Sequence, residues 1–155
     1  MKIELIQELK TDTDLTVLGF FDEDEDLFRS FNTELYEELS HALNENHFKK
    51  KFGSCYSTKL IGGKHRRVLV ISLGEKKDFS LEKLRKVVTK AVKFAKAKKY
   101  SSFSTNIVNI QEGFNDEELG RALSEGLYLS NYQFKKYVSE DEPEKELETV
   151  YIQRR

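Results

Sequence analysis

The chain has 155 residues, a length that predicts one domain with a core large enough to need no disulfide or metal. Its 26 basic and 27 acidic residues give a net charge of −1, which excludes a protein whose overall charge would drive it onto nucleic acid or a membrane. Charged residues make up 34% of the chain and aromatic residues 12%, a balance typical of a folded domain with a hydrated surface rather than of a disordered chain.

The first third of the chain predicts two strands and a helix. Apolar residues alternate imperfectly over 3–9, which indicates a first strand, and the near-continuous apolar run over 15–21 is typical of a strand buried on both faces. An acidic run at 22–26 then stands where negative charge favours the start of a helix. The helix expected over about 25–43 has one apolar stripe, formed by Phe28, Phe31, Leu35, Leu39 and Ala42.

The middle of the chain predicts two strands joined by a turn, then a helix. A basic loop over 46–53 precedes a loosely alternating strand at 55–61, and a turn at Gly62-Gly63 leads into a strong strand at 66–73. Ser80 can cap the following helix through its hydroxyl. Two stripes are expected on that helix, one buried (Leu81, Leu84, Val88, Ala91, Ala95) and one exposed and basic (Lys83, Lys86, Lys90, Lys93).

The last third predicts a strand at 103–108, a helix over about 116–129 that opens with an Asn115/Glu118 capping box, an acidic loop at 139–146 and a final strand at 147–152. Gly120 and Gly126 cost this helix roughly 1 kcal/mol each relative to alanine, so close packing against a neighbouring element is expected there. Strands alternate with helices throughout. The sequence therefore predicts a single α/β domain over 1–155, with a mixed sheet between helices on both faces, in three layers.

A search for catalytic or metal-binding groups finds none. His41, His47 and His65 lack partners at metal-ligand spacing and are expected on the surface. Cys55 is interpreted as a small buried apolar residue rather than a nucleophile, and as the one cysteine it excludes an internal disulfide. Gly62-Gly63-Lys64 joins two strands, which favours a hairpin turn over a phosphate loop. A charged N-terminus, the reduced cysteine and the lack of a run of about 20 apolar residues predict a cytoplasmic domain with no membrane contact.

Two stretches resemble the N-terminal domain of the leucyl (cytosol) aminopeptidase family. The strand Arg67-Val-Leu-Val-Ile-Ser-Leu-Gly74 leads into an Ala/Lys-rich helix, as in that family. A later helix matches the family's E-G-x-x-L-x-x-Y-x-F-x-x-Y pattern, and the matching residues are Glu125, Gly126, Leu129, Tyr132, Phe134 and Tyr137. The similarity extends over essentially the whole chain, and it implies a macro-domain-like fold.

The resemblance also implies a hexameric parent enzyme that removes N-terminal residues from peptides with two divalent metals, Zn or Mn. The family's metal ligands and catalytic residues lie in a C-terminal domain around an N-T-D-A-E-G-R motif, which is absent from this sequence. We therefore expect no catalytic, cofactor or metal residue in this chain, and a C-terminal catalytic domain as its partner. Leu129, Tyr132, Phe134 and Tyr137 are the candidates for packing against that domain, although packing within the chain explains them as well.

Two other functions remain open at this stage. Macro-like folds elsewhere recognise ADP-ribose, so a stand-alone module that binds ADP-ribose or a related nucleotide is the alternative, with Gly62-Gly63 as its poorly placed phosphate loop. The basic stripe at 83–93 would suit nucleic acid. However, no aromatic-interleaved, helix-turn-helix or zinc-finger pattern accompanies the stripe, so a nucleic-acid partner is not expected.

Overall fold

The computed structural model of the chain describes residues 1–10, 12–24, 52–59, 67–137 and 147–154, without the side chains of 131–137. Within these ranges it contains six strands: β1 (Lys2–Ile6), β2 (Leu15–Phe21), β3 (Cys55–Lys59), β4 (Arg67–Gly74), β5 (Ser102–Thr105) and β6 (Thr149–Gln153). It also contains the helices α3 (Leu81–Ala97) and α4 (Asp116–Tyr137) and the short 3-10 turns η1 (Asp22–Asp24) and η2 (Lys76–Asp78). The helix expected over 25–43, the Gly62-Gly63 turn and the acidic loop at 139–146 lie outside these residues.

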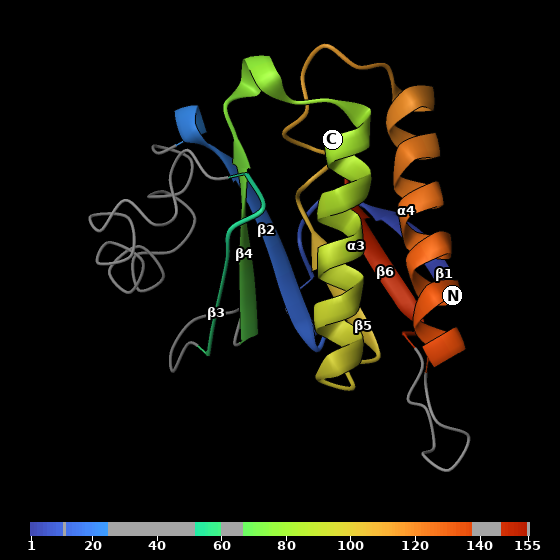
Figure 1. Cartoon of the computed structure of the whole chain (residues 1–155). Helices are drawn as coiled ribbons and strands as arrows, with labels where there is room; N and C mark the ends of the chain where they lie inside the picture. Colours follow the sequence, from blue (N-terminus) through green and yellow to red (C-terminus); the bar gives the residue numbers. More distant parts are fainter. Residues whose placement is uncertain (11, 25–51, 60–66, 138–146, 155) are drawn as a thin grey trace.

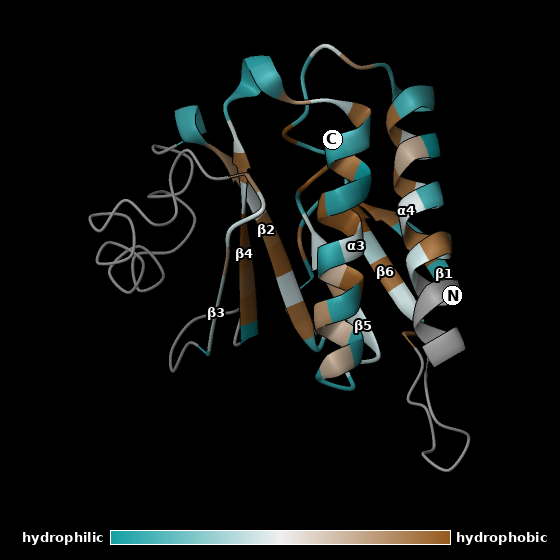
Figure 2. Cartoon of the chain, in the orientation of Figure 1, coloured by the Kyte–Doolittle hydropathy of each residue, from teal (hydrophilic) through white to brown (hydrophobic). Residues whose placement is uncertain are grey.

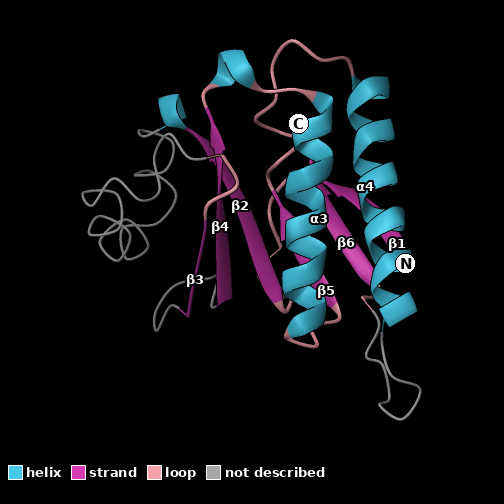
Figure 3. Ribbon diagram, viewed as in Figure 1, coloured by secondary structure: helices cyan, strands magenta, loops and turns pink. Residues whose placement is uncertain are grey.

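The strands form one mixed sheet in the order β1-β6-β5-β2-β4-β3. Every neighbouring pair is parallel except β3 and β4, which are antiparallel. Figures 1 and 3 show α3 and α4 side by side in front of the sheet, both running along the strands. The chain is therefore an α/β domain, as predicted, with its parallel strands at the centre and an antiparallel strand at one edge.

The core lies between the two helices and the sheet. Val17 of β2, Ile71 of β4 and Phe103 of β5 are at most 1% exposed and face α3 and α4 in one apolar cluster. On α3 the buried residues Leu84, Val88 and Ala91 recur three and four positions apart, and Figure 2 shows brown, apolar residues alternating with teal, hydrophilic ones along the helix. The opposite face of the central strands is buried as well, since Leu18 and Val70 are fully enclosed. Both faces of β2 and β4 are therefore covered, as their continuous apolar runs predict.

Both predicted helix caps are present. Ser80 Oγ accepts a hydrogen bond from the backbone N–H of Lys83, 3.2 Å away, and so begins α3. Asn115 Oδ1 accepts from the backbone N–H of Glu118 at 2.8 Å, while the Glu118 carboxylate accepts from the Asn115 N–H, which is a reciprocal capping box. α4 continues to Tyr137, eight residues beyond the expected end at 129, because no glycine or proline interrupts it after Gly126.

The strand predicted over 103–108 ends earlier than expected, at Thr105. The next side chain, Asn106, takes the place of further backbone pairing: its Oδ1 accepts from the N–H of Gly19 at 2.8 Å, and its Nδ2 donates to the Gly19 carbonyl at 3.3 Å. The chain then turns, with the Asn109 N–H donating to the Asn106 carbonyl. The side chain of Asn106 thus completes the hydrogen bonding of β2 after the backbone of β5 has left the sheet.

Candidate functional site

Candidate metal ligands do not gather in the described part of the chain. There, no three His, Cys, Asp or Glu side chains lie together so that they could hold a metal ion. His41, His47 and His65 fall in ranges outside the description. No helix among the described residues is long and apolar enough to cross a bilayer.

Cys55 is exposed, so the expectation that it is buried was wrong. The reason is the place of β3, which forms the edge of the sheet and whose side chains alternate between half-buried and exposed. The Cys55 thiol donates to the Gly53 carbonyl at 3.4 Å. Partial burial raises the pKa of the Cys55 thiol, and this effect outweighs the positive charge of Lys90, which lowers the pKa. The thiol is therefore protonated at neutral pH and is not an activated nucleophile.

The carboxyl edge of the sheet, where α/β proteins commonly bind ligands, is acidic and internally bonded. η1 follows β2 at this edge, and the Glu23 carboxylate accepts from the backbone N–H of Lys76 at 3.2 Å. The Asp24 carboxylate accepts from the Phe21 N–H and forms an ion pair with the Lys76 ammonium at 3.3 Å. These carboxylates oppose the binding of a pyrophosphate at this edge. The Gly62-Gly63 turn, the other feature considered for ADP-ribose, lies outside the described residues.

Three members of the basic stripe on α3 make contacts within the chain. Lys90 Nζ donates to the Gly53 carbonyl at 2.6 Å, Lys86 lies 3.8 Å from the Glu82 carboxylate, and Lys83 lies over the ring of Phe52. The first of these contacts holds the turn before β3 against the helix. Within the stripe, Lys90 therefore has a structural role in the fold.

Of the two helices that the structure describes, α4 carries the more prominent exposed apolar surface. Leu129 is 59% exposed and Tyr128 is 54% exposed. Tyr132 follows these two residues by three and four positions, so its backbone position in α4 lies in the same row. Phe134 and Tyr137 follow the buried residues Leu127 and Ser130 by seven, and so lie in the row that faces the core. The side chains of Tyr132, Phe134 and Tyr137 are outside the description.

The α4 surface, formed by Tyr128 and Leu129, lies next to a seam of side-chain contacts between the two helices. Arg85 Nε of α3 donates to the Glu125 carboxylate of α4 at 2.8 Å, and Ser130 Oγ donates to Thr89 Oγ1 at 2.9 Å. Between these contacts lies Gly126, whose lack of a side chain lets the two helices approach closely. The sequence pattern singled out Leu129, but it missed Tyr128, whose exposure depends on how α4 rotates against α3.

Comparison with known proteins gives consistent matches. The sequence profile described as "Cytosol aminopeptidase family, N-terminal domain" matches residues 17–141. A probable cytosol aminopeptidase of Microcystis aeruginosa is 29% identical over 122 residues, which are 78% of this chain and 24% of that protein. One from Alkaliphilus metalliredigens is 24% identical over 160 residues, which cover 98% of this chain and 32% of that protein. The chain thus spans about a quarter to a third of the length of these relatives.

Solved structures show the same fold. A mutant tomato leucine aminopeptidase superposes with a TM-score of 0.75 at 20% identity, covering 99% of this chain and 32% of that chain. The macrodomain of Mycobacterium tuberculosis DarG superposes with a TM-score of 0.69 at 10% identity, covering 99% of this chain and 98% of that domain. The fold is therefore that of the macrodomains and of the N-terminal domain of leucine aminopeptidase, as the sequence resemblance implied.

Proposed function

Because this chain belongs to the cytosol aminopeptidase family through its N-terminal domain, we propose that it is the non-catalytic domain of a two-metal aminopeptidase, and that it serves in assembly and interdomain packing. One observation carries the proposal: the chain matches the N-terminal domain of the family and covers only 24–32% of the two relatives described above. In this proposal, peptide hydrolysis and its two divalent metals, Zn or Mn, belong to a C-terminal catalytic domain in the cytoplasm. A hexameric parent belongs to the same proposal.

The α4 surface supports the interdomain part of the proposal. Leu129 and Tyr128 are adjacent, more than half exposed, and held in a helix that is fixed against α3. Transfer of such side chains from water into an interface is favourable, by roughly 25 cal/mol for each Å² of apolar surface buried. A domain that packs on α4 would gain this energy without ordering the helix first.

We expect Leu129 to be accessible in this chain alone and covered in the full polypeptide. Leu129→Cys in a Cys55→Ser background should react quickly with a maleimide in the isolated chain, because Leu129 is 59% exposed. In the complete reading frame, which we expect to continue into a domain with the N-T-D-A-E-G-R motif, labelling should be about tenfold slower or more because the thiol is covered.

A matched control is Glu117→Cys in the same background, which places a thiol at another exposed position of α4, about three turns away. Its labelling rate should be the same in the isolated chain and in the full polypeptide. Equal labelling of Leu129→Cys in both proteins would contradict the docking of a catalytic domain on α4. A reading frame that stops after Arg155 would contradict interdomain packing in the same polypeptide.

A further inference from the structure

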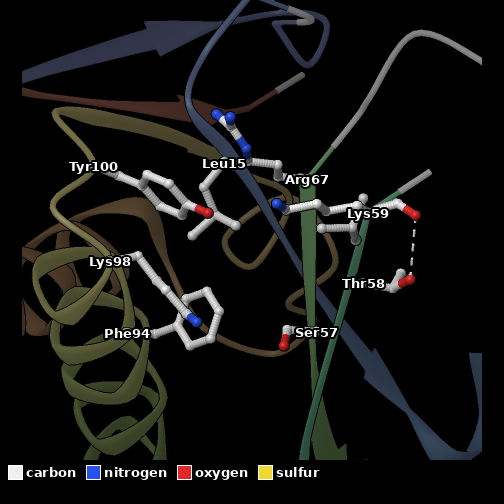
Figure 4. Close-up of a pocket in the computed structure, with 9 residues that line it drawn as sticks. Leu15, Ser57, Thr58, Lys59, Arg67, Phe94, Lys98 and Tyr100 are labelled. Atoms are coloured by element: carbon white, nitrogen blue, oxygen red, sulfur yellow. Dashed lines mark hydrogen bonds between the residues drawn. The ribbon is translucent and has the colours of Figure 1, made fainter. Parts of the chain in front are cut away.

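A cationic cavity lies at the edge of the sheet opposite to the acidic carboxyl edge. Its volume is about 240 Å³, and it opens between β3, the amino ends of β2 and β4, and the end of α3. Leu15 and Val68, both buried, contribute apolar surface to its lining. Figure 4 shows the side chains of Lys59 and Tyr100 extending toward one another beside Leu15. The charged side chains around the cavity, rather than its position in the sheet, indicate the chemistry of a ligand for the cavity.

Three cationic side chains surround the cavity: Lys59 of β3, Arg67 of β4 and Lys98 just after α3. None of the described residues that line it is acidic, and no ion pair recorded within the described part of the chain joins these three groups to a carboxylate. The charge density is high for a chain whose net charge is −1. These cations can therefore be balanced by an anion from solution.

The register of the sheet adds a second, independent observation. Lys59 and Arg67 are direct cross-strand partners in the antiparallel β3–β4 pair. Like charges directly opposite one another on neighbouring strands destabilise a sheet. Such a conflict between local sequence and fold is typical of a functional position, and a bound anion would remove the repulsion.

Aromatic rings hold two of the cations in place. The Arg67 guanidinium carbon lies 5.4 Å from the centre of the Tyr100 ring, and Lys98 Nζ lies 5.9 Å from that of Phe94. Tyr100 is itself fixed, because its backbone N–H donates to the Ala95 carbonyl at 2.9 Å in the turn that ends α3. The cations are thus partly ordered before any ligand arrives, which lowers the entropic cost of binding.

The donors favour phosphate over a simple carboxylate. A guanidinium presents a planar pair of N–H donors that matches two phosphate oxygens, and ammonium groups supply point charges to the others. Ser57 and Tyr100 line the same cavity and add hydroxyl donors. We propose that this cationic cavity binds a small phosphate-bearing molecule. This site is separate from the α4 surface and does not depend on the aminopeptidase assignment.

The test uses calorimetric titration of the chain with pyrophosphate, with inorganic phosphate and AMP as further probes and succinate as a dicarboxylate control. Saturable binding of pyrophosphate in about the millimolar range is expected, with weaker binding of succinate. Inorganic phosphate that binds as well as AMP would show that the phosphate group alone is recognised. Tighter binding of AMP than of inorganic phosphate would show that the nucleoside also contacts the cavity. Either result supports the proposal.

Charge-matched variants locate the binding. Lys59→Gln and Arg67→Gln should each weaken pyrophosphate binding about tenfold or more, whereas Lys93→Gln, which removes the same charge from the exposed side of α3, should leave it unchanged. Lys59→Gln should also be at least as stable to urea as the natural chain, because the facing positive charges are gone. The proposal would be overturned if Lys93→Gln weakened pyrophosphate binding as much as Lys59→Gln, or if pyrophosphate did not saturate the chain by about 10 mM. It would also be overturned if succinate bound as tightly as pyrophosphate, or if Lys59→Gln were less stable than the natural chain.

Discussion

Asn106→Ala is expected to lower the free energy of unfolding by about 2–4 kcal/mol, because it leaves two backbone groups of one buried residue without partners. Asn106 is 6% exposed, and its amide both accepts from the N–H of Gly19 and donates to the Gly19 carbonyl. Gly19 lies in the middle of β2, where water cannot replace the lost side chain without entering the core. Urea unfolding followed by circular dichroism measures the change.

Gln7→Ala provides the control for this substitution. It also removes an amide side chain, but from an exposed position where, among the described residues, the backbone carbonyl of Gln7 rather than its side chain accepts a hydrogen bond from Gln153. A change within about 0.5 kcal/mol is expected for the control. If Asn106→Ala were as mild as Gln7→Ala, then Gly19 would not depend on the Asn106 amide for its hydrogen bonds.

Gly126→Leu is expected to destabilise the chain by about 2–3 kcal/mol, although leucine is a much better helix former than glycine. A β-carbon at Gly126 would lie 3.1 Å from both Cβ and Cγ1 of Val88 and 3.4 Å from the Arg85 carbonyl oxygen. The side chain would therefore force α4 away from α3 and weaken the seam that carries the α4 surface. Thermal and urea unfolding both measure the loss.

Gly120→Leu is the matched control, since it makes the same change in the same helix. Apart from its two chain neighbours and the local helix backbone, no atom of the described residues lies within 4 Å of a β-carbon built at Gly120. This variant should gain about 0.5–1 kcal/mol of stability from helix propensity alone. The two substitutions should thus have opposite signs. If both stabilised the chain, the close approach of the two helices at Gly126 would be refuted.

These two glycines also show what the sequence could and could not predict. Both stood out as costly residues in a predicted helix, and close packing was the expected reason; this holds for Gly126 but not for Gly120. A pattern of 3.6 residues per turn gives the face of a helix but not the distance to its neighbour. Capping at Ser80 and at Asn115 was predictable, because a cap depends on residues three positions apart.

Features that depend on distant partners were not predictable in this way. The end of β5 is set by Asn106 and Gly19, which are 87 residues apart in the sequence. The edge position of β3, which exposes Cys55, follows from the order of strands in the sheet rather than from the strand's own residues. The pairing of Lys59 with Arg67 likewise becomes visible only in the register.

The candidate site was predicted in part. The family pattern identified Leu129 as a candidate for interdomain packing, and the structure shows its side chain exposed on α4; the packing role itself stays a prediction. Tyr128 and the cationic cavity were missed, because the first lies outside the pattern and the second is assembled from four elements. That hydrolysis and its metals belong to another domain remains part of the proposal and awaits its test.

The assignment of hydrolysis to a separate domain is tested most directly by a peptidase assay on the pure 155-residue chain. Leucine p-nitroanilide is incubated with the chain in the presence of Mn²⁺ or Zn²⁺, and release of p-nitroaniline is compared with that in the same buffer without protein. We predict no release above this background. Metal-dependent turnover that rises in proportion to the concentration of the chain would contradict the account.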